Sequence, residues 1–194
     1  EGIMAMGSLA VAMVGIISLA PVLGNLLTPV VGPIYSALGA DPAMFATTLL
    51  ANDMGGAPLA LKMAQNPEAG KLAAFILGSM MGPTIVFTIP VALGIIEKDD
   101  NPYLAKGILA GITTIPLGVL AGGLVAGFPI GLILVNLIPI IIVSALIILG
   151  LIFIPEKMTK GFAIFGQAVV IIITIGLVAA IIQELTGFVV IPGM

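Results

Sequence analysis

Residues 41–60 read Asp41-Pro-Ala-Met-Phe-Ala-Thr-Thr-Leu-Leu-Ala-Asn-Asp-Met-Gly-Gly-Ala-Pro-Leu-Ala60, and they contain both a helix start and a helix break. An aspartate followed by a proline is typical of an N-cap and a first helical turn, so a helix is expected to begin at Asp41 and to run to about Ala51. Two glycines and a proline follow and should stop it, because none of them favours a continuing helix. A second short helix can restart near Leu59.

The composition places this stretch in a membrane. The chain is 60% hydrophobic and 8% charged, with a mean hydropathy of +1.33, whereas soluble domains carry about 25% charged residues. It has no cysteine and no histidine, which removes thiol nucleophiles, the usual zinc ligands and imidazole triads. We therefore expect no enzyme, no catalytic residue, no metal and no cofactor. Its net charge of −3 also argues against nucleic acid as a partner.

The gaps between charged residues predict the membrane spans, because a spanning helix needs about 20 apolar residues. A kinked span is expected at 72–96, with Pro83 and Pro90 as the kinks and the hydroxyls of Thr84 and Thr88 bonding loosened carbonyls. The sequence predicts an all-α integral membrane protein, a polytopic helical bundle forming one membrane domain over 1–194, with a broken or re-entrant helix pair at about 41–65. Five clear spans and one rougher, proline-rich segment are expected, the spans at 2–20, 72–96, 107–127, 130–154 and 161–183 and the rougher segment at 21–39.

The lysines give an expected orientation. The polar links at 97–106 and 155–160 hold four of the six lysines and are separated by two predicted crossings. The positive-inside rule places both links in the cytoplasm and the turn at 127–129, which has no lysine, on the outside. Lys62 and Lys71 fall on the outer side, so the rule is obeyed only in part.

Asp53 is the candidate functional side chain. It is the one charged residue between Asp41 and Lys62, and a charge at membrane depth usually faces the protein interior and serves a function. A carboxylate beside a helix break suits a small organic cation, since unwound helices in transporters bind ions this way. The predicted substrate-binding residues are the carboxylate, its hydrogen-bonding neighbours and the glycines of the break: Asp53, Asn52, Thr48, Gly55 and Gly56. The other interpretation, that Asp53 caps the restarting helix at a membrane surface, stays open.

Two further features favour structural interpretations. Glycines at 107, 111, 118 and 122 form two G-x-x-x-G units on one helical face, a pattern typical of close helix packing, within the chain or in a homo-oligomer. Glu184 lies near the end of the last predicted span, where an interfacial carboxylate is more common than a proton carrier.

Five blocks of the sequence together resemble the EutH-type ethanolamine permeases of bacteria, and the resemblance covers nearly the whole chain. The blocks are Met4-Ala-Met-Gly-Ser-Leu-Ala, Leu19-Ala-Pro-Val-Leu, Leu38-Gly-Ala-Asp-Pro-Ala-Met-Phe-Ala-Thr-Thr-Leu-Leu-Ala-Asn-Asp-Met-Gly-Gly56, Leu77-Gly-Ser-Met-Met-Gly-Pro-Thr-Ile-Val-Phe-Thr-Ile-Pro-Val-Ala-Leu-Gly-Ile-Ile-Glu97 and Phe153-Ile-Pro-Glu-Lys-Met158.

This resemblance implies a multi-pass protein of the bacterial inner membrane that moves ethanolamine, a small ammonium ion at neutral pH, into the cytoplasm. Ethanolamine would be the partner of Asp53, and the lipid bilayer would surround the protein. Members of the family are longer, so the chain resembles an N-terminal portion that lacks a first helix and the second repeat, which would complete the site. Two departures from the family stand out, Ala57-Pro58 in place of an aromatic residue and a tight turn at Gly127.

The residues leave two alternatives to an ethanolamine transporter. One is a non-catalytic membrane scaffold or assembly subunit that packs through its glycine-rich helix faces. The other is an intramembrane aspartyl hydrolase, which ranks last because it needs two neighbouring carboxylates and a G-x-G-D sequence, and Asp53 has neither.

Overall fold

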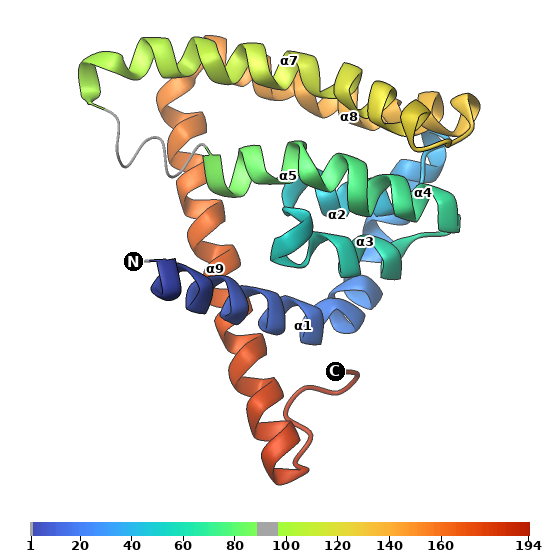
Figure 1. Ribbon diagram of the computed structural model, residues 1–194, viewed down its shortest axis with the longest axis vertical. Coiled ribbons are helices and arrows are strands. Elements are labelled where there is room, and N and C mark those ends of the chain that lie inside the picture. The colour runs from blue at the N-terminus through green and yellow to red at the C-terminus, as the bar shows by residue number, and fades with distance from the viewer. Residues whose placement is uncertain (1, 89–96) are drawn as a thin grey trace.

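The computed structural model describes residues 2–88 and 97–194, and no strand occurs among them. The predicted all-α membrane fold is confirmed. The long helices are α1 (Gly2–Ala37), α7 (Asn101–Val125), α8 (Ile130–Phe153) and α9 (Pro155–Thr186). Between α1 and α7 the chain forms short helices and turns, drawn in cyan to green in Figure 1: α2 (Ala43–Leu49), η1 (Asn52–Gly56), α3 (Ala57–Met63), α4 (Pro67–Lys71), η2 (Leu72–Ile76), η3 (Leu77–Ser79), α5 (Met81–Pro83) and η4 (Thr84–Thr88), with η5 (Lys98–Asp100) immediately before α7.

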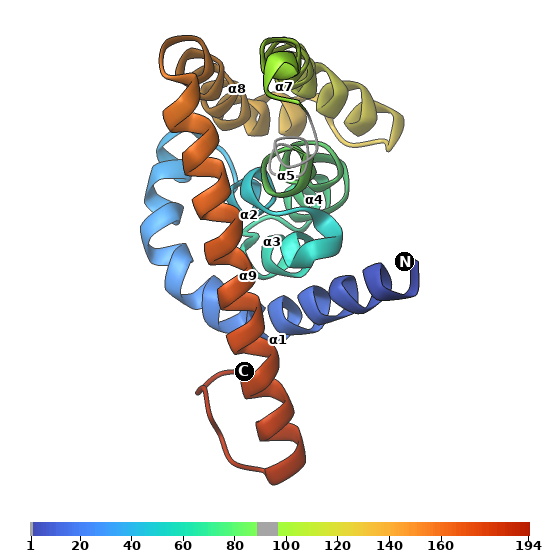
Figure 2. The same cartoon turned by 90° about the vertical axis from the view of Figure 1, so that its left-hand side faces the viewer.

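Three helices in the described part of the chain are long and apolar enough to cross a membrane, within α1 (Val14–Ala37), α7 (Lys106–Val125) and α8 (Ile130–Phe153). The expected boundary between two segments at Pro21 is wrong, because α1 continues through three prolines, Pro21, Pro29 and Pro33. A proline removes one backbone donor and bends a helix without necessarily ending it. The helix changes direction along its length (Figure 2).

The helices α7 and α8 form an antiparallel hairpin, as the sequence predicts. The connecting turn is closed by bonds from the N–H of Gly127 to the Leu124 carbonyl (3.0 Å) and from the N–H of Phe128 to the Gly123 carbonyl (3.0 Å). Gly127 has a φ of 83°, a left-handed conformation that glycine adopts at no steric cost.

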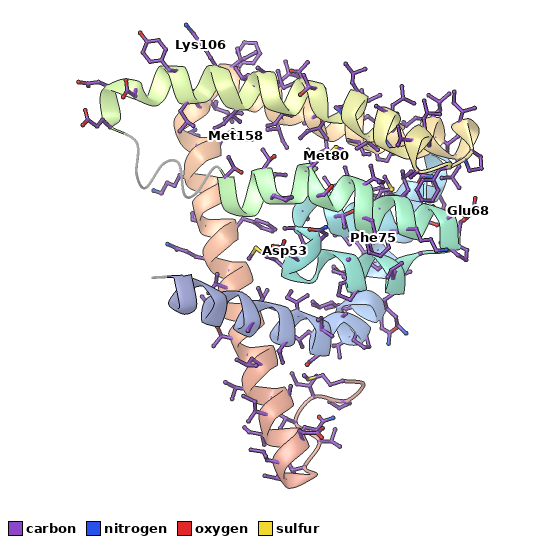
Figure 3. All side chains as sticks on the ribbon, viewed as in Figure 1. Asp53, Glu68, Phe75, Met80, Lys106 and Met158 are labelled. Carbon is purple, nitrogen blue, oxygen red and sulfur yellow. The ribbon has the colours of Figure 1, made fainter. Side chains whose placement is uncertain are left out.

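Residues 72–88 are helical but irregular, passing through η2, η3, α5 and η4 in succession. The hydroxyl of Thr84 donates to the Met80 carbonyl (2.8 Å), as expected beside Pro83. Met80 points from this segment toward α7 (Figure 3), where its sulfur lies 3.0 Å from the position of a Cβ built on Gly118. Pro90 and the rest of 89–96 lie outside the described residues, so the span at 72–96 stays a prediction.

The last predicted span, 161–183, falls partly outside the residues whose side chains the structure describes, so it stays a prediction. It lies within α9, which runs across the direction of α7 and α8 (Figure 1) and packs against α1. The stretch Val170–Thr186 of α9 is apolar. Glu184 lies exposed near its end.

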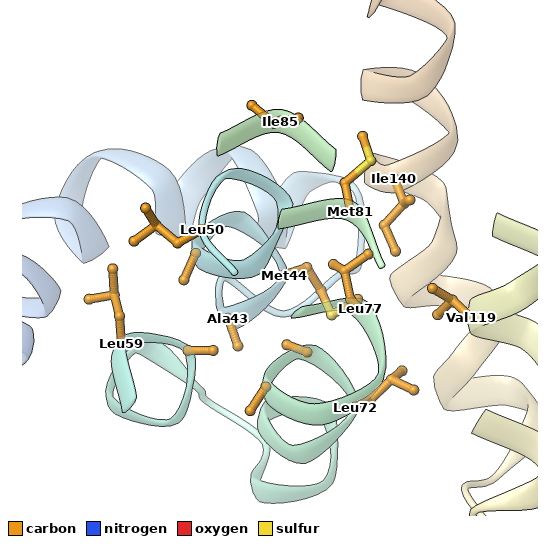
Figure 4. Packing of buried hydrophobic residues seen from close by; sticks show 14 of the residues in the cluster. Ala43, Met44, Leu50, Leu59, Leu72, Leu77, Met81, Ile85, Val119 and Ile140 are labelled. Atoms are coloured by element: carbon orange, nitrogen blue, oxygen red, sulfur yellow. The ribbon is translucent and has the colours of Figure 1, made fainter. Parts of the chain in front are cut away.

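The core surrounds the two short helices α2 and α3. Ala43 and Met44 of α2 are fully buried, together with Leu72, Leu77 and Met81 from 72–88. Val119 of α7 and Ile140 of α8 belong to the same buried cluster (Figure 4). Large apolar side chains on α7, α8 and α9 are exposed, as expected of helices that face lipid.

Candidate functional site

The helices α2 and α3 pack side by side and form a helical hairpin whose tip is η1. After Leu49 the backbone becomes extended, with ψ of 138° at Leu50 and 148° at Ala51. The first helix therefore ends two residues before the expected limit at Ala51. The second begins at Ala57 instead of Leu59, because Pro58 occupies the first turn, where its missing N–H would have had no helical partner.

Glycines are required around this tip by close backbone approaches. Gly55 has a φ of 84°, and a Cβ there would overlap the Ile16 side chain of α1. A Cβ on Gly56 would lie 2.5 Å from the Leu50 carbonyl oxygen and 2.6 Å from that of Ala51. A Cβ on Gly82 would overlap the same carbonyl of Leu50. The extended pair Leu50-Ala51 is thus enclosed by glycine backbone.

Asp53 is exposed at the hairpin tip. Its N–H donates to the Asn52 side-chain oxygen (2.8 Å). Its carboxylate has no hydrogen bond or ion pair within residues 2–88 and 97–194. Figure 3 shows the side chain between α1 and the 72–88 segment, both of which contact η1. The carboxylate is therefore available to a ligand.

The structure brings four of the five predicted site residues into one turn: Asn52, Asp53, Gly55 and Gly56. Thr48 lies in α2, before the extended pair Leu50-Ala51, and is buried. Its hydroxyl donates to the Met44 carbonyl (2.6 Å) and lies next to the Tyr35 phenol. The hydroxyl proton of Thr48 is therefore already bonded within α2.

The length of α2 sets the distance between the tip and the base of the hairpin. Seven helical residues rise about 10 Å and two extended residues add about 7 Å, giving roughly 17 Å in total. The hydrocarbon core of a bilayer is about 30 Å thick. A hairpin whose base lies at one membrane surface would therefore carry its tip to about the midplane.

Asp41 ties the base of the hairpin together, a role that goes beyond the predicted N-cap. Its Oδ1 accepts from the N–H of Ala43 (2.8 Å), which is the expected cap. Its Oδ2 accepts from the N–H of Gln65 (3.0 Å) and of Asn66 (2.7 Å), at the far end of α3. Only 7% of Asp41 is exposed, so both ends of the hairpin are fastened by one buried carboxylate.

A second contact fastens this base to α8. The N–H of Asp41 donates to the side-chain oxygen of Asn136 (2.8 Å), whose amide nitrogen donates to the Leu132 carbonyl (2.9 Å). Asn136 is 5% exposed and was not predicted from the sequence. Asn136 is the one amide side chain in the predicted span 130–154, and this is the signal that could have identified it, because a polar group at that depth needs a partner.

An open hollow of about 410 Å³ lies at the base of the hairpin. It is formed by the end of the α1–α2 link, the α3–α4 link and the first turns of α8. Its polar lining comes from Asp41, Gln65, Asn66 and Asn136.

These features define a class, an α-helical membrane protein built around a packed helical hairpin with a free carboxylate at its tip. The family model described as "Ethanolamine utilisation protein, EutH" matches residues 1–194, so the chain belongs to this family. The family named from the five sequence blocks is therefore confirmed.

Curated relatives agree with this assignment. The "Probable ethanolamine permease EutH" of Listeria monocytogenes is 70% identical over 194 residues, which are all of this chain and 52% of that protein. The proteins of the same name from Salmonella typhimurium and Escherichia coli are each 56% identical over 207 aligned residues, covering all of this chain and 51% of theirs. The chain thus spans about half the length of these relatives. No solved structure matches it.

Proposed function

We propose that this chain is part of a carrier that moves ethanolamine across the bacterial inner membrane into the cytoplasm, and that Asp53 binds the substrate ammonium. The observation that carries the proposal is the unpaired carboxylate of Asp53 on a helical hairpin of a membrane protein. The printed names of the relatives, probable ethanolamine permeases, supply the substrate. A permease moves its substrate unchanged, so we assign no catalytic residue.

The charges support an ammonium substrate at this position. A unit positive charge about 4 Å from the carboxylate gains on the order of 4 kcal/mol at an effective dielectric near 20. The side chain of Asn52 and the backbone of the break supply further polar groups beside it. The close backbone approaches of Gly56 and Gly82 to Leu50-Ala51 support the proposal, because they pack the helix break in place without a ligand.

The alternative of a scaffold that packs through glycine faces is less well supported. Two of the four glycines of its proposed face are covered within the chain itself. Cβ atoms on Gly118 and Gly122 would contact Met80 and Ile76, respectively.

Uptake of labelled ethanolamine into vesicles tests the proposal. We expect Asp53→Asn in the full-length protein to lower uptake at least tenfold, because the substitution removes the charge and keeps the side-chain size. Glu68→Gln is the matched control, since Glu68 is an exposed carboxylate on α4, and it should leave uptake unchanged. Equal uptake by wild-type and Asp53→Asn proteins, at equal amounts in the membrane, would overturn the assignment.

A further inference from the structure

We propose that the hollow at the base of the hairpin is a second site for a small organic ammonium, separate from Asp53. The ligand, ethanolamine, rests on the proposed function, whereas the residues that line the hollow are separate from Asp53. The two sites lie at opposite ends of the segment formed by α2 and the extended pair Leu50-Ala51, which together span roughly 17 Å.

The hollow has a fixed negative charge in its wall. Asp41 lines it and is its one acidic side chain, and none of the described residues that line it is basic. The carboxylate is buried, so water screens its charge less than that of an exposed group. A volume of about 410 Å³ easily admits a molecule as small as an amino alcohol together with water.

The hydrogen bonds of Asp41 favour a cation over an anion. Three backbone N–H groups around the carboxylate, those of Ala43, Gln65 and Asn66, already donate to it. Each carboxylate oxygen has about two acceptor positions. Oδ2 uses both of its positions and Oδ1 uses one, so one acceptor position is left for an ammonium proton.

The lining also favours an organic ammonium over a metal ion. No group of three or more acidic, histidine or cysteine side chains that could hold a metal occurs among the residues the structure describes. Magnesium and calcium need several oxygen ligands and usually more than one carboxylate. The amides of Gln65, Asn66 and Asn136 can instead pair with the hydroxyl of an amino alcohol.

Equilibrium binding of radiolabelled ethanolamine to the purified full-length protein tests this site. We expect the Asp53→Asn protein to retain one class of ethanolamine sites. In that background, Gln65→Lys should weaken binding about tenfold, because it places a positive charge beside the hollow, and Gln65→Glu should not weaken it. Gln65→Met, which is uncharged, is the control for loss of the Gln65 amide itself. All three variants keep the backbone N–H of Gln65 that bonds Asp41, and gel filtration checks that each is folded.

Two results would overturn the second site. One is a folded Asp53→Asn protein that binds no ethanolamine. The other is equal affinity of the Gln65→Lys and Gln65→Glu proteins. If uptake still depends on Asp53 in either case, the proposed function stands and the second site alone fails. If Asp53→Asn leaves uptake unchanged while the Gln65 series behaves as expected, the hairpin tip fails and the second site stands.

Discussion

At the scale of single residues, Asp41 is the side chain on which the hairpin most depends. Asp41→Ala would leave three backbone N–H groups without their acceptor, one buried and two partly buried, and an unpaired buried group costs about 1–3 kcal/mol. We expect the free energy of unfolding in detergent to fall by about 3 kcal/mol or more. Asp41→Asn keeps one acceptor oxygen, so its free energy of unfolding should lie between those of the wild-type and Asp41→Ala proteins. Glu68→Ala, an exposed carboxylate, is the control, and an equal loss in it would contradict the role of Asp41.

The neighbouring hydroxyls of Thr47 and Thr48 should respond oppositely to valine. Thr47 is fully buried, and its hydroxyl has no hydrogen-bond partner among the residues that the structure describes. Removing an unpaired buried hydroxyl should stabilise the fold, so Thr47→Val should raise the unfolding free energy by about 1 kcal/mol. Thr48→Val removes a bond to the Met44 carbonyl and should lower it by a similar amount. Denaturant unfolding of the two variants in detergent measures both, and a loss of stability in Thr47→Val would show that its hydroxyl has a partner.

The sequence predicted the local role of Asp41 and missed its distant partners. The cap bond joins residues two positions apart, whereas Gln65, Asn66 and Asn136 lie 24, 25 and 95 positions away. Helix signals describe neighbours along the chain, so they could not show that one carboxylate closes the hairpin. Asp53 was predictable as a candidate because an isolated charge in an apolar stretch is visible in one dimension.

At the scale of elements, the crossing of α1 and α9 depends on glycine. A Cβ on Gly176 would lie 2.7 Å from the Gly15 carbonyl oxygen of α1, and backbone cannot turn aside as a side chain can. Gly176→Ala should therefore separate the two helices and cost about 1–3 kcal/mol. Gly161→Ala in the same helix meets nothing within 4 Å and should stabilise by up to about 1 kcal/mol. Unfolding of the two variants in detergent measures the difference, and equal effects would contradict the close crossing.

Regular elements were predicted better than irregular ones. The α7–α8 hairpin follows from two long apolar stretches and one glycine-containing turn, and the structure has it as expected. The boundary at Pro21 was wrong because a proline inside a helix has the same sequence signal as a proline that ends one. The irregular course of residues 72–88 depends on Gly82 meeting the backbone of Leu50, a tertiary contact that no local pattern contains.

At the scale of the whole molecule, the hairpin base and the α7–α8 turn lie at the same end. The base is bonded to Asn136, six residues or about 9 Å from the start of α8. The lysine-containing link before α7 lies at the end of α7 that is far from the α7–α8 turn. A hairpin that enters from the turn side and returns to it therefore presents Glu68 on the same membrane face as Ala126. The link at Asp100 would be on the opposite face.

Single cysteines labelled from one side of the membrane test this arrangement. The chain has no cysteine, so each introduced thiol is the one label site in this part of the protein. Exposed positions are available in the turn (Ala126→Cys), beside the hairpin base (Glu68→Cys) and before α7 (Asp100→Cys). A membrane-impermeant maleimide on intact cells should label the first two, and the third should react only after permeabilisation, because the positive-inside rule places the lysine links in the cytoplasm.

Each other labelling pattern contradicts a different part of the topology. Labelling of Ala126→Cys and Asp100→Cys from the same side would show that α7 does not cross the membrane, against its 20-residue apolar stretch. Labelling of Glu68→Cys from the same side as Asp100→Cys would mean that the hairpin does not return to the side from which it enters. Reversal of the whole pattern would fit the predicted re-entrant hairpin with its base toward the cytoplasm. The hollow beside Asp41 would then receive ethanolamine after its passage, so the labelling experiment also decides whether that site precedes or follows Asp53.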